Sequence, residues 1–343
     1  MNAYTLAVVI IAIALVFDYI NGFHDAANSI ATIVATRVLT PFQAVLWAAF
    51  FNFAAAAIFG EAVARSVADG FIDIKLATQY VLMAALIGAI IWDLITWWLG
   101  LPTSSSHALI GGLAGAGMAH IGLERGFAHS FEALNVSATG KWPFTLKMII
   151  GAPLIGLIAA FFLMVAVYWL FRNYSPSRMD KYFRRLQLLS AAAFSLTHGG
   201  NDAQKTAGII TGVLLTGGFI KELKVPTWVL MASYSAIALG TLSGGWRIVR
   251  TMGGRLTRLK PRSGFCAETG AAASVFIASH LGVPVSTTHA IAGAIAGVGS
   301  IQRMKAVRWG IAANIVWAWV LTIPAAAIIA WCAFFLLHVT IGA

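Results

Sequence analysis

The sequence has few charged residues and almost no cysteine. Only 10% of its 343 residues are charged and two are cysteines, whereas 59% are hydrophobic. Soluble domains average about 25% charged residues, so this composition excludes an ordinary soluble enzyme and a disordered chain. Cys266 and Cys332 lie in apolar segments, without the spacing of a metal site or a redox pair. The composition predicts an all-α polytopic membrane protein, because only helices suit segments this long and apolar.

Motifs typical of enzymes are also missing. Four histidines lie in apolar surroundings, but no HExxH or other known motif of closely spaced metal ligands is present. We therefore predict that the chain is not an enzyme and that it has no catalytic residues, no cofactor and no resident metal site.

Several apolar segments are long enough to cross a bilayer, whose core of ~30 Å takes about 20 helical residues. They lie near 42–62, 148–171, 228–248 and 309–337, and the first apolar stretch, 4–17, lacks the features of a cleaved signal peptide. Shorter apolar segments are interrupted by proline, glycine and hydroxyl residues. These form two pairs, 78–100 with 104–118 and 265–282 with 286–300, each of which predicts a re-entrant helical hairpin.

The two predicted hairpins are copies of one another. LGLPTSSSHALIGGLAGAG at 99–117 recurs as LGVPVSTTHAIAGAIAGVG at 281–299, with ten of the nineteen positions identical. An internal repeat in a membrane protein is typical of secondary transporters. The four-residue spacing of the glycines that follow each tip favours close helix packing.

Basic residues predict the orientation of the chain. They concentrate in segments 172–187, 247–262 and 303–308, which the positive-inside rule places in the cytoplasm. Basic residues in short loops between spans do not indicate nucleic-acid binding. Both termini are then outside, the first hairpin enters from outside and the second from the cytoplasm. We therefore predict one transport domain over 1–343, with inverted repeats at 1–171 and 188–343 and a basic cytoplasmic loop at 172–187.

Six charged residues remain at membrane depth, where each costs at least ~2.5 kcal/mol and needs a partner or a watery cavity. Two lie in related motifs, FHDAANSIAT at 23–32 and GGNDAQKTAG at 199–208. Asparagine and glycine in these motifs predict an unwound backbone, so each repeat should begin with a broken helix. For Asp18 and Asp93 we favour structural roles. The six residues are Asp18, Asp25, Asp93, Asp202, Lys205 and Glu268.

The hairpin tips have the composition of an anion site. Pro102 and Pro284 disfavour helix at the preceding residue and suit the first turn of a new helix, so TSSSH and VSTTH should each open one. A helix N-terminus offers free N–H groups and a partial positive charge. The side chains at these tips add hydroxyl donors.

These motifs, HDAAN, GGNDAQKT, PTSSSH and PVSTTH, resemble those of the Pit inorganic phosphate transporters, and the resemblance to the bacterial low-affinity type covers nearly the whole chain. It implies import of inorganic phosphate across the cytoplasmic, or inner, membrane by symport with sodium ions or protons. Some bacterial members carry a neutral metal phosphate. The transported species can be free phosphate or a metal phosphate, and the protein can be a monomer or a homo-oligomer. A sulfate or other oxyanion permease of the same architecture is the competing interpretation, and a passive anion channel is a further one.

The departures from the family motif bear on the coupling ion. His24 stands before Asp25 where the family has asparagine. Sodium-coupled members carry a second asparagine in each repeat. In this chain Asn28 matches it in the first repeat, but Lys205 takes its place in the second. A lysine charge can replace the charge of sodium, which favours a proton as the coupling ion. Phosphate near neutral pH carries a P–OH that a carboxylate such as Asp25 accepts, while sulfate is repelled.

The predicted site therefore has two sets of residues. For His107 and His289, a bracing role and a proton-carrying role remain equally open. The coupling-ion candidates are His24, Asp25, Asp202 and Glu268. The residues predicted to bind substrate are Asp25, Asn28, Ser104, Ser105, Ser106, Asn201, Asp202, Lys205, Ser286, Thr287 and Thr288.

Overall fold

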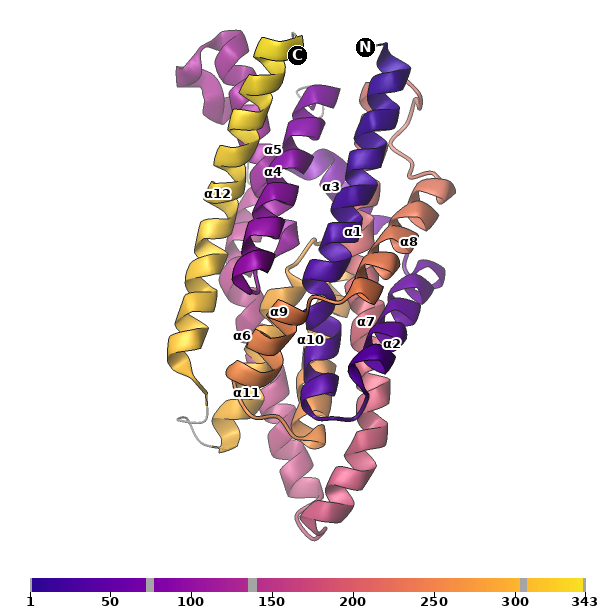
Figure 1. Cartoon of the computed structure of the whole chain (residues 1–343), viewed down its shortest axis with the longest axis vertical. Coiled ribbons are helices and arrows are strands. Elements are labelled where there is room, and N and C mark those ends of the chain that lie inside the picture. The colour runs from indigo at the N-terminus through magenta and orange to yellow at the C-terminus, as the bar shows by residue number, and fades with distance from the viewer. Residues whose placement is uncertain (1, 72–76, 135–140, 303–306, 342–343) are drawn as a thin grey trace.

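The structure, a computed structural model, describes residues 2–71, 77–134, 141–302 and 307–341. Helices account for nearly all of these residues, and none of them forms a β-strand (Figure 1). The helices are α1 (Ala3–Ala35), α2 (Pro41–Ala54), α3 (Ala62–Gly70), α4 (Gln79–Leu99), α5 (Ser105–Arg125), α6 (Lys141–Leu170), α7 (Pro176–Thr216), α8 (Thr227–Ser243), α9 (Trp246–Arg250), α10 (Pro261–His280), α11 (Thr287–Gln302) and α12 (Trp309–Ile341).

Membrane-spanning helices are confirmed. Within the described residues, α1, α4, α6 and α12 are long and apolar enough to cross a bilayer. A fifth candidate span is the pair formed by segments 41–57 and 62–68, which bends by 85° at a short break. The chain is therefore a multi-pass membrane protein, as its composition predicts.

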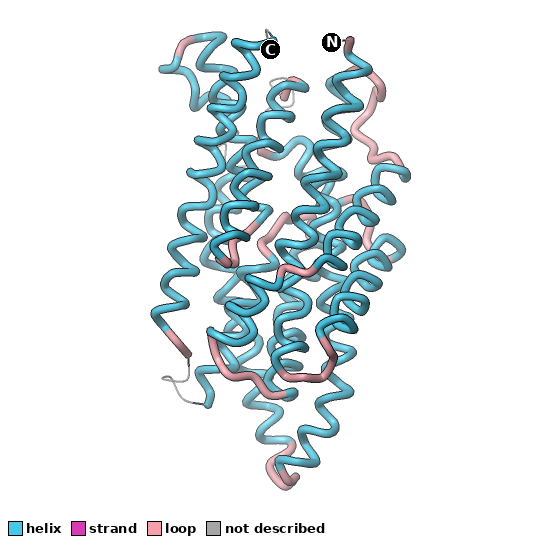
Figure 2. The backbone as a smooth tube through the Cα atoms, viewed as in Figure 1, coloured by secondary structure: helices cyan, strands magenta, loops and turns pink. Residues whose placement is uncertain are grey.

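Both predicted hairpins are present, as α4 with α5 and as α10 with α11. Each first helix is followed within two residues by a glycine in the left-handed conformation, Gly100 at φ 67° after α4 and Gly282 at φ 68° after α10. A side chain disfavours this conformation, so glycine lets the chain turn sharply there. The two turns lie at mid-height inside the helical body, and the hairpins reach them from opposite ends (Figures 1 and 2). Both termini lie at one end, and the turn between α6 and α7 lies at the other.

The second helix of each hairpin packs along a long helix from the other half of the chain. Helix α5 lies against α12, and α11 lies against α6. A Cβ atom added at Gly115 would come within 1.9 Å of the Ala327 carbonyl oxygen, and one at Gly293 within 2.0 Å of the Pro153 oxygen. These glycines therefore let backbones touch, as their spacing predicts.

The predicted breaks in the first helix of each repeat are wrong. Helix α1 runs without interruption through 23–32, and α7 through 199–208. Gly199, which suggested unwinding in the second motif, serves close packing instead, and so does Gly22 directly before the first motif. A Cβ atom at Gly22 would lie 2.3 Å from the Ile237 oxygen of α8, and one at Gly199 would lie 2.5 Å from the Asn52 oxygen of α2. Packing of this kind overrides the weak helix propensity of glycine.

The broken helices are instead the second ones. Segment 42–62, predicted as a plain span, bends between α2 and α3, and 228–248 is interrupted at Gly244, where φ is 67°. The predicted loop 172–187 is also helical from Pro176 onward, because Ser-Pro at 175–176 provides a typical helix start. Residues 303–306, in the third predicted basic loop, lie outside the described residues.

Replacing Gly115 with alanine should destabilise the protein, because the new methyl group has only the α12 backbone to displace. Overpacking of this kind costs about 1–3 kcal/mol. Gly212→Ala is the matched control, since its Cβ would meet only Leu82 at an ordinary 3.6 Å. Thermal unfolding in detergent should show a lower midpoint for Gly115→Ala than for the control, and equal midpoints would contradict the packing role.

Candidate functional site

The centre of the molecule holds a buried lysine that touches three different segments. The Lys205 ammonium donates to Asp202 Oδ1 at 2.5 Å and to Ser106 Oγ at 2.5 Å. It also donates to the carbonyl oxygen of Val285 at 3.0 Å. Asp202 and Lys205 share one face of α7 at i and i+3, while the other two acceptors belong to the two hairpin tips. One side chain therefore connects α7 to both hairpins.

A matching group of side chains lies on α1. The Asn28 amide donates to Thr288 Oγ1 at 2.9 Å and to Thr287 Oγ1 at 3.3 Å. Thr288 donates in turn to Asp25 Oδ2 at 3.4 Å, and Thr287 donates to Asp202 Oδ2 at 3.3 Å. The second hairpin tip thus lies between the acidic residues of α1 and α7.

The serines that precede the helices of the hairpins have a structural task. Ser104 Oγ accepts from the His107 N–H at 3.3 Å, and Ser286 Oγ accepts from the His289 N–H at 3.1 Å. These are N-caps, and they confirm that TSSSH and VSTTH open helices. The Ser105 hydroxyl is buried and has no hydrogen-bond partner among the described residues.

His24 is held beside the site by α4 and the first hairpin tip. One ring nitrogen, Nδ1, lies 2.7 Å from Asp25 Oδ1, and the other, Nε2, lies 3.0 Å from Thr96 Oγ1. Thr103 at the tip donates to Thr96 at 2.9 Å. The pairing with both a carboxylate and a hydroxyl fixes the orientation of the ring.

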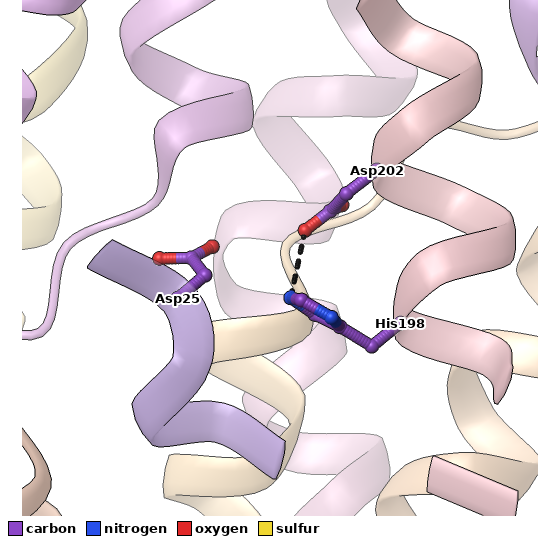
Figure 3. A group of neighbouring side chains, drawn as sticks. All are labelled: Asp25, His198 and Asp202. Carbon is purple, nitrogen blue, oxygen red and sulfur yellow. Dashed lines mark ion pairs between the residues drawn. The ribbon is translucent and has the colours of Figure 1, made fainter. Parts of the chain in front are cut away.

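His198 completes a cluster that the sequence analysis did not assign to the site. Its Nε2 lies 3.2 Å from Asp202 Oδ2, and its Nδ1 lies 3.2 Å from Asn52 Oδ1. Asp25, His198 and Asp202 each present an atom within 4.8 Å of the others (Figure 3). Two oxygens and one nitrogen at this spacing can hold a divalent cation. In the sequence, His198 and Asp202 are four residues apart, which places them on one face of a continuous helix. Because a broken helix was expected here, this spacing was not used.

Two predicted site residues face elsewhere. The Asn201 amide donates to Ser279 Oγ at 2.8 Å and to the Val283 oxygen at 3.4 Å, and so holds the end of α10. Glu268 accepts from the Thr32 and Ser190 hydroxyls, both at 2.5 Å, and from the Gln187 amide at 3.0 Å. It is a fully buried carboxylate that connects α10 to α1 and α7.

His107 and His289 meet between the two hairpins. Their ring centroids are 4.8 Å apart, and His289 stacks on Trp319 with centroids 3.9 Å apart. The Trp319 indole donates to the Pro102 oxygen at 2.9 Å. These contacts tie each tip to the other and to α12, which is the geometry of a brace.

The assembled site suits a polyatomic anion that also carries a proton. Two helix N-termini and Lys205 supply positive potential and donors. Asp25 and Asp202 supply acceptors. The whole group is buried, with each of these three side chains at most 3% exposed, so electrostatic interactions within it are strong.

Comparisons with known proteins agree with this geometry. A model of the phosphate transporter family matches residues 21–330. A Rhizobium meliloti (strain 1021) protein named "probable low-affinity inorganic phosphate transporter" is 54% identical, over 95% of each chain. A Bacillus subtilis (strain 168) protein of the same name is 41% identical, over 97% of each chain. A solved structure named "the sodium-dependent phosphate transporter" has the same fold, with a TM-score of 0.85, 24% identity and coverage of 98% of this chain and 100% of its own. The chain therefore belongs to the phosphate transporter family.

Proposed function

We propose that the protein imports inorganic phosphate across the cytoplasmic membrane by symport with a cation, and that this cation is a proton. The two hairpins belong to inverted repeats, 1–171 and 188–343, and both termini are outside. The substrate site then opens alternately to the two sides as the halves move around it.

The convergence of both hairpin tips on Lys205 and Asp202 supports this proposal most strongly. A helix N-terminus arrives from each end of the molecule at the same buried group. Each tip also presents side chains that contact the acidic helices, Ser106 from the first and Thr287 from the second. An anion between the tips would contact both halves of the chain at once, as alternating access requires.

Lys205 supports a proton over sodium. Its ammonium already occupies the neighbourhood of Asp202, where a sodium ion would otherwise balance the charge. When phosphate binds, an oxygen of the substrate replaces one of the ammonium's present acceptors. The competing coupling ion is sodium, for which the similar solved structure is named.

The carboxylates support phosphate over sulfate. Asp25 Oδ2 receives only a long hydrogen bond of 3.4 Å from Thr288, so it is available to a stronger donor. Hydrogen phosphate supplies such a donor in its P–OH group, and sulfate has none near neutral pH. The same carboxylate therefore attracts one tetrahedral anion and repels the other.

A second candidate for the species transported is a neutral metal phosphate. The observation that favours it is the cluster of Asp25, His198 and Asp202 beside the donors of the tips. In this version the divalent metal is a co-substrate and not a resident cofactor. Metal uptake that requires phosphate, measured with radioactive manganese or zinc, would support it.

Reconstitution in liposomes tests the proposed function directly. Radiolabelled phosphate uptake is measured under an inward proton gradient and, separately, under an inward sodium gradient, each with and without excess sulfate. We expect proton-driven uptake that resists sulfate. Active sulfate uptake without phosphate uptake would favour the oxyanion permease, while sodium-driven phosphate uptake would reject the proton.

Lys205→Asn should weaken phosphate binding by at least about tenfold, since a hydrogen bond to a charged group contributes roughly 1.5–3 kcal/mol. The remaining uptake should gain a dependence on sodium, because the site then lacks a fixed cation. Lys181→Asn is the matched control, as Lys181 is exposed on the same helix. Normal phosphate uptake by Lys205→Asn without sodium would contradict the role of the lysine.

Asp25→Asn should reduce the preference for phosphate over sulfate by about tenfold or more, because an amide can donate to either anion. The measurement is inhibition of labelled phosphate binding by increasing sulfate. Asp180→Asn serves as the control, since Asp180 pairs with Arg262 away from the tips. An unchanged preference in Asp25→Asn would show that another group selects the anion.

A further inference from the structure

Asp18 is a buried carboxyl group without an ion-pair partner among the described residues. It is 0% exposed, and neither oxygen has a hydrogen-bond partner among the described residues. The coupling-ion candidates differ from it, because His24, Asp25, Asp202 and Glu268 all have polar partners at 2.5–3.4 Å. Leaving an ionised carboxylate buried without a partner is strongly unfavourable. Asp18 therefore needs a proton or another cation.

The surroundings of Asp18 are polar and come from three helices. Asn21 of α1 and Thr206 of α7 lie next to its carboxyl group, and Tyr234 of α8 stands close by. The Asn21 oxygen and the Thr206 and Tyr234 hydroxyls also have no hydrogen-bond partner among the described residues. These buried polar groups lie around the Asp18 carboxyl group as a small polar cluster inside the protein.

No fixed cation in the described part of the chain is bonded to Asp18. The charged side chains that act on it are Asp202 and Lys205, both on α7. An ammonium group has three N–H donors, and those of Lys205 are directed to Asp202, Ser106 and the Val285 oxygen. The lysine therefore belongs to the substrate site, and the charge of Asp18 has to be balanced by an exchangeable cation.

The position of Asp18 relates it to the substrate site. It precedes Asp25 by seven residues, about 10 Å along α1. Helix α1 starts at the end that holds the termini, and α7 runs toward that end (Figure 1). Asp18 precedes Asp25 on α1 and Thr206 follows Asp202 on α7, so both lie toward the terminal end from these acids. With the termini outside, as we propose above, a proton from the outer solution reaches Asp18 before it reaches Asp25.

We propose that Asp18 binds the coupling proton, with Asn21, Thr206 and Tyr234 as its polar lining; this inference rests on the proton symport proposed above. The carboxylate takes one proton from the outer solution and releases it on the cytoplasmic side, and no bond to phosphate forms or breaks. Protonation removes a negative charge beside Asp202 and so favours an incoming anion. By linkage, bound phosphate favours the proton equally.

Asp18→Asn tests the proposal, because asparagine mimics the protonated acid in size and charge. A carrier held in this form should still exchange labelled phosphate across liposomes without gradients, since the loaded carrier can reorient. It should fail to accumulate phosphate under a proton gradient, because the empty carrier cannot release its proton and return. Wild-type phosphate affinity should rise as the outer pH falls, within the 5- to 150-fold range typical of coupled sites, and this dependence should vanish in Asp18→Asn.

Two further variants control for structural effects. Asp18→Glu restores an acid and should recover part of the accumulation. Asp93→Asn is the matched control, since Asp93 is also 0% exposed with unpartnered oxygens, but the charged groups that act on it most strongly are His24 and Asp25, with Asp202 after them. Asp93→Asn should keep proton-driven accumulation. An equal loss in Asp93→Asn and Asp18→Asn would show that neutralising any buried acid has this effect, and would overturn the assignment.

The remaining outcomes are also decisive. Normal accumulation of phosphate by Asp18→Asn would overturn the proposal. A variant that loses both phosphate exchange and phosphate accumulation would also overturn it. Infrared difference spectra on phosphate addition should contain a protonated-carboxyl band that Asp18→Asn lacks, and an unchanged band would contradict the proposal without any transport measurement. Accumulation by the wild-type protein under a sodium gradient alone would instead reject the proton coupling itself. If the predictions for Asp18→Asn are contradicted but the wild-type protein still shows proton-driven uptake, only the role of Asp18 is rejected and the proposed function stands.

Discussion

The arrangement of the site depends on the bonding of one buried ammonium group. A lysine inside a membrane protein is tolerated only with partners, and Lys205 finds them on α7 and on both hairpin tips. Because these partners come from segments far apart in the sequence, satisfying one charge fixes the relative positions of three elements. Asn28 fixes the position of α1 relative to the second hairpin tip, because its amide donates to two threonines there. The polar centre thus specifies the tertiary structure around it.

The crosswise packing of the hairpins gives this centre its support. Helix α5 lies on α12 and α11 lies on α6, with glycines at contacts where any side chain would strike backbone. Apolar side chains gain little from association inside a bilayer, so close backbone contact is the main source of stability there. Contacts as close as these tolerate little sliding along the glycine faces. In the alternating access that we propose, movement is therefore more easily made at the tips and at the glycine-containing break between α8 and α9.

Much of this could be predicted from the sequence, for reasons that also explain the errors. Proline after glycine in LGLP and LGVP marks a turn whose chemistry is local, so both hairpins and both helix starts were predicted correctly. Gly199 gave the wrong result, since glycine signals equally an unwound helix and a close contact, and only the neighbouring helix distinguishes them. Asn201 was predicted to bind substrate and Glu268 to be a coupling-ion candidate, because sequence shows that a polar residue is buried, not which partner it finds. His198 was missed because a broken helix was expected there, which hid its i, i+4 relation to Asp202.

A fixed lysine in place of a bound cation has a consequence for energy coupling. Lys205 compensates part of the charge of an anion, but it cannot leave the protein, so it transfers no energy from an ion gradient. The symport that we propose therefore needs an exchangeable cation at another place that senses the same substrate. Asp25 and Asp202 are engaged by His24 and Lys205, and Glu268 by three donors, so their charges are already stabilised within the fold. A carboxyl group that lacks such stabilisation, and lies beside Asp202, changes its protonation most readily when an anion arrives. The absence of a partner at Asp18 is therefore a useful property in a proton-coupled carrier, because a fully bonded acid would hold its charge through the whole cycle.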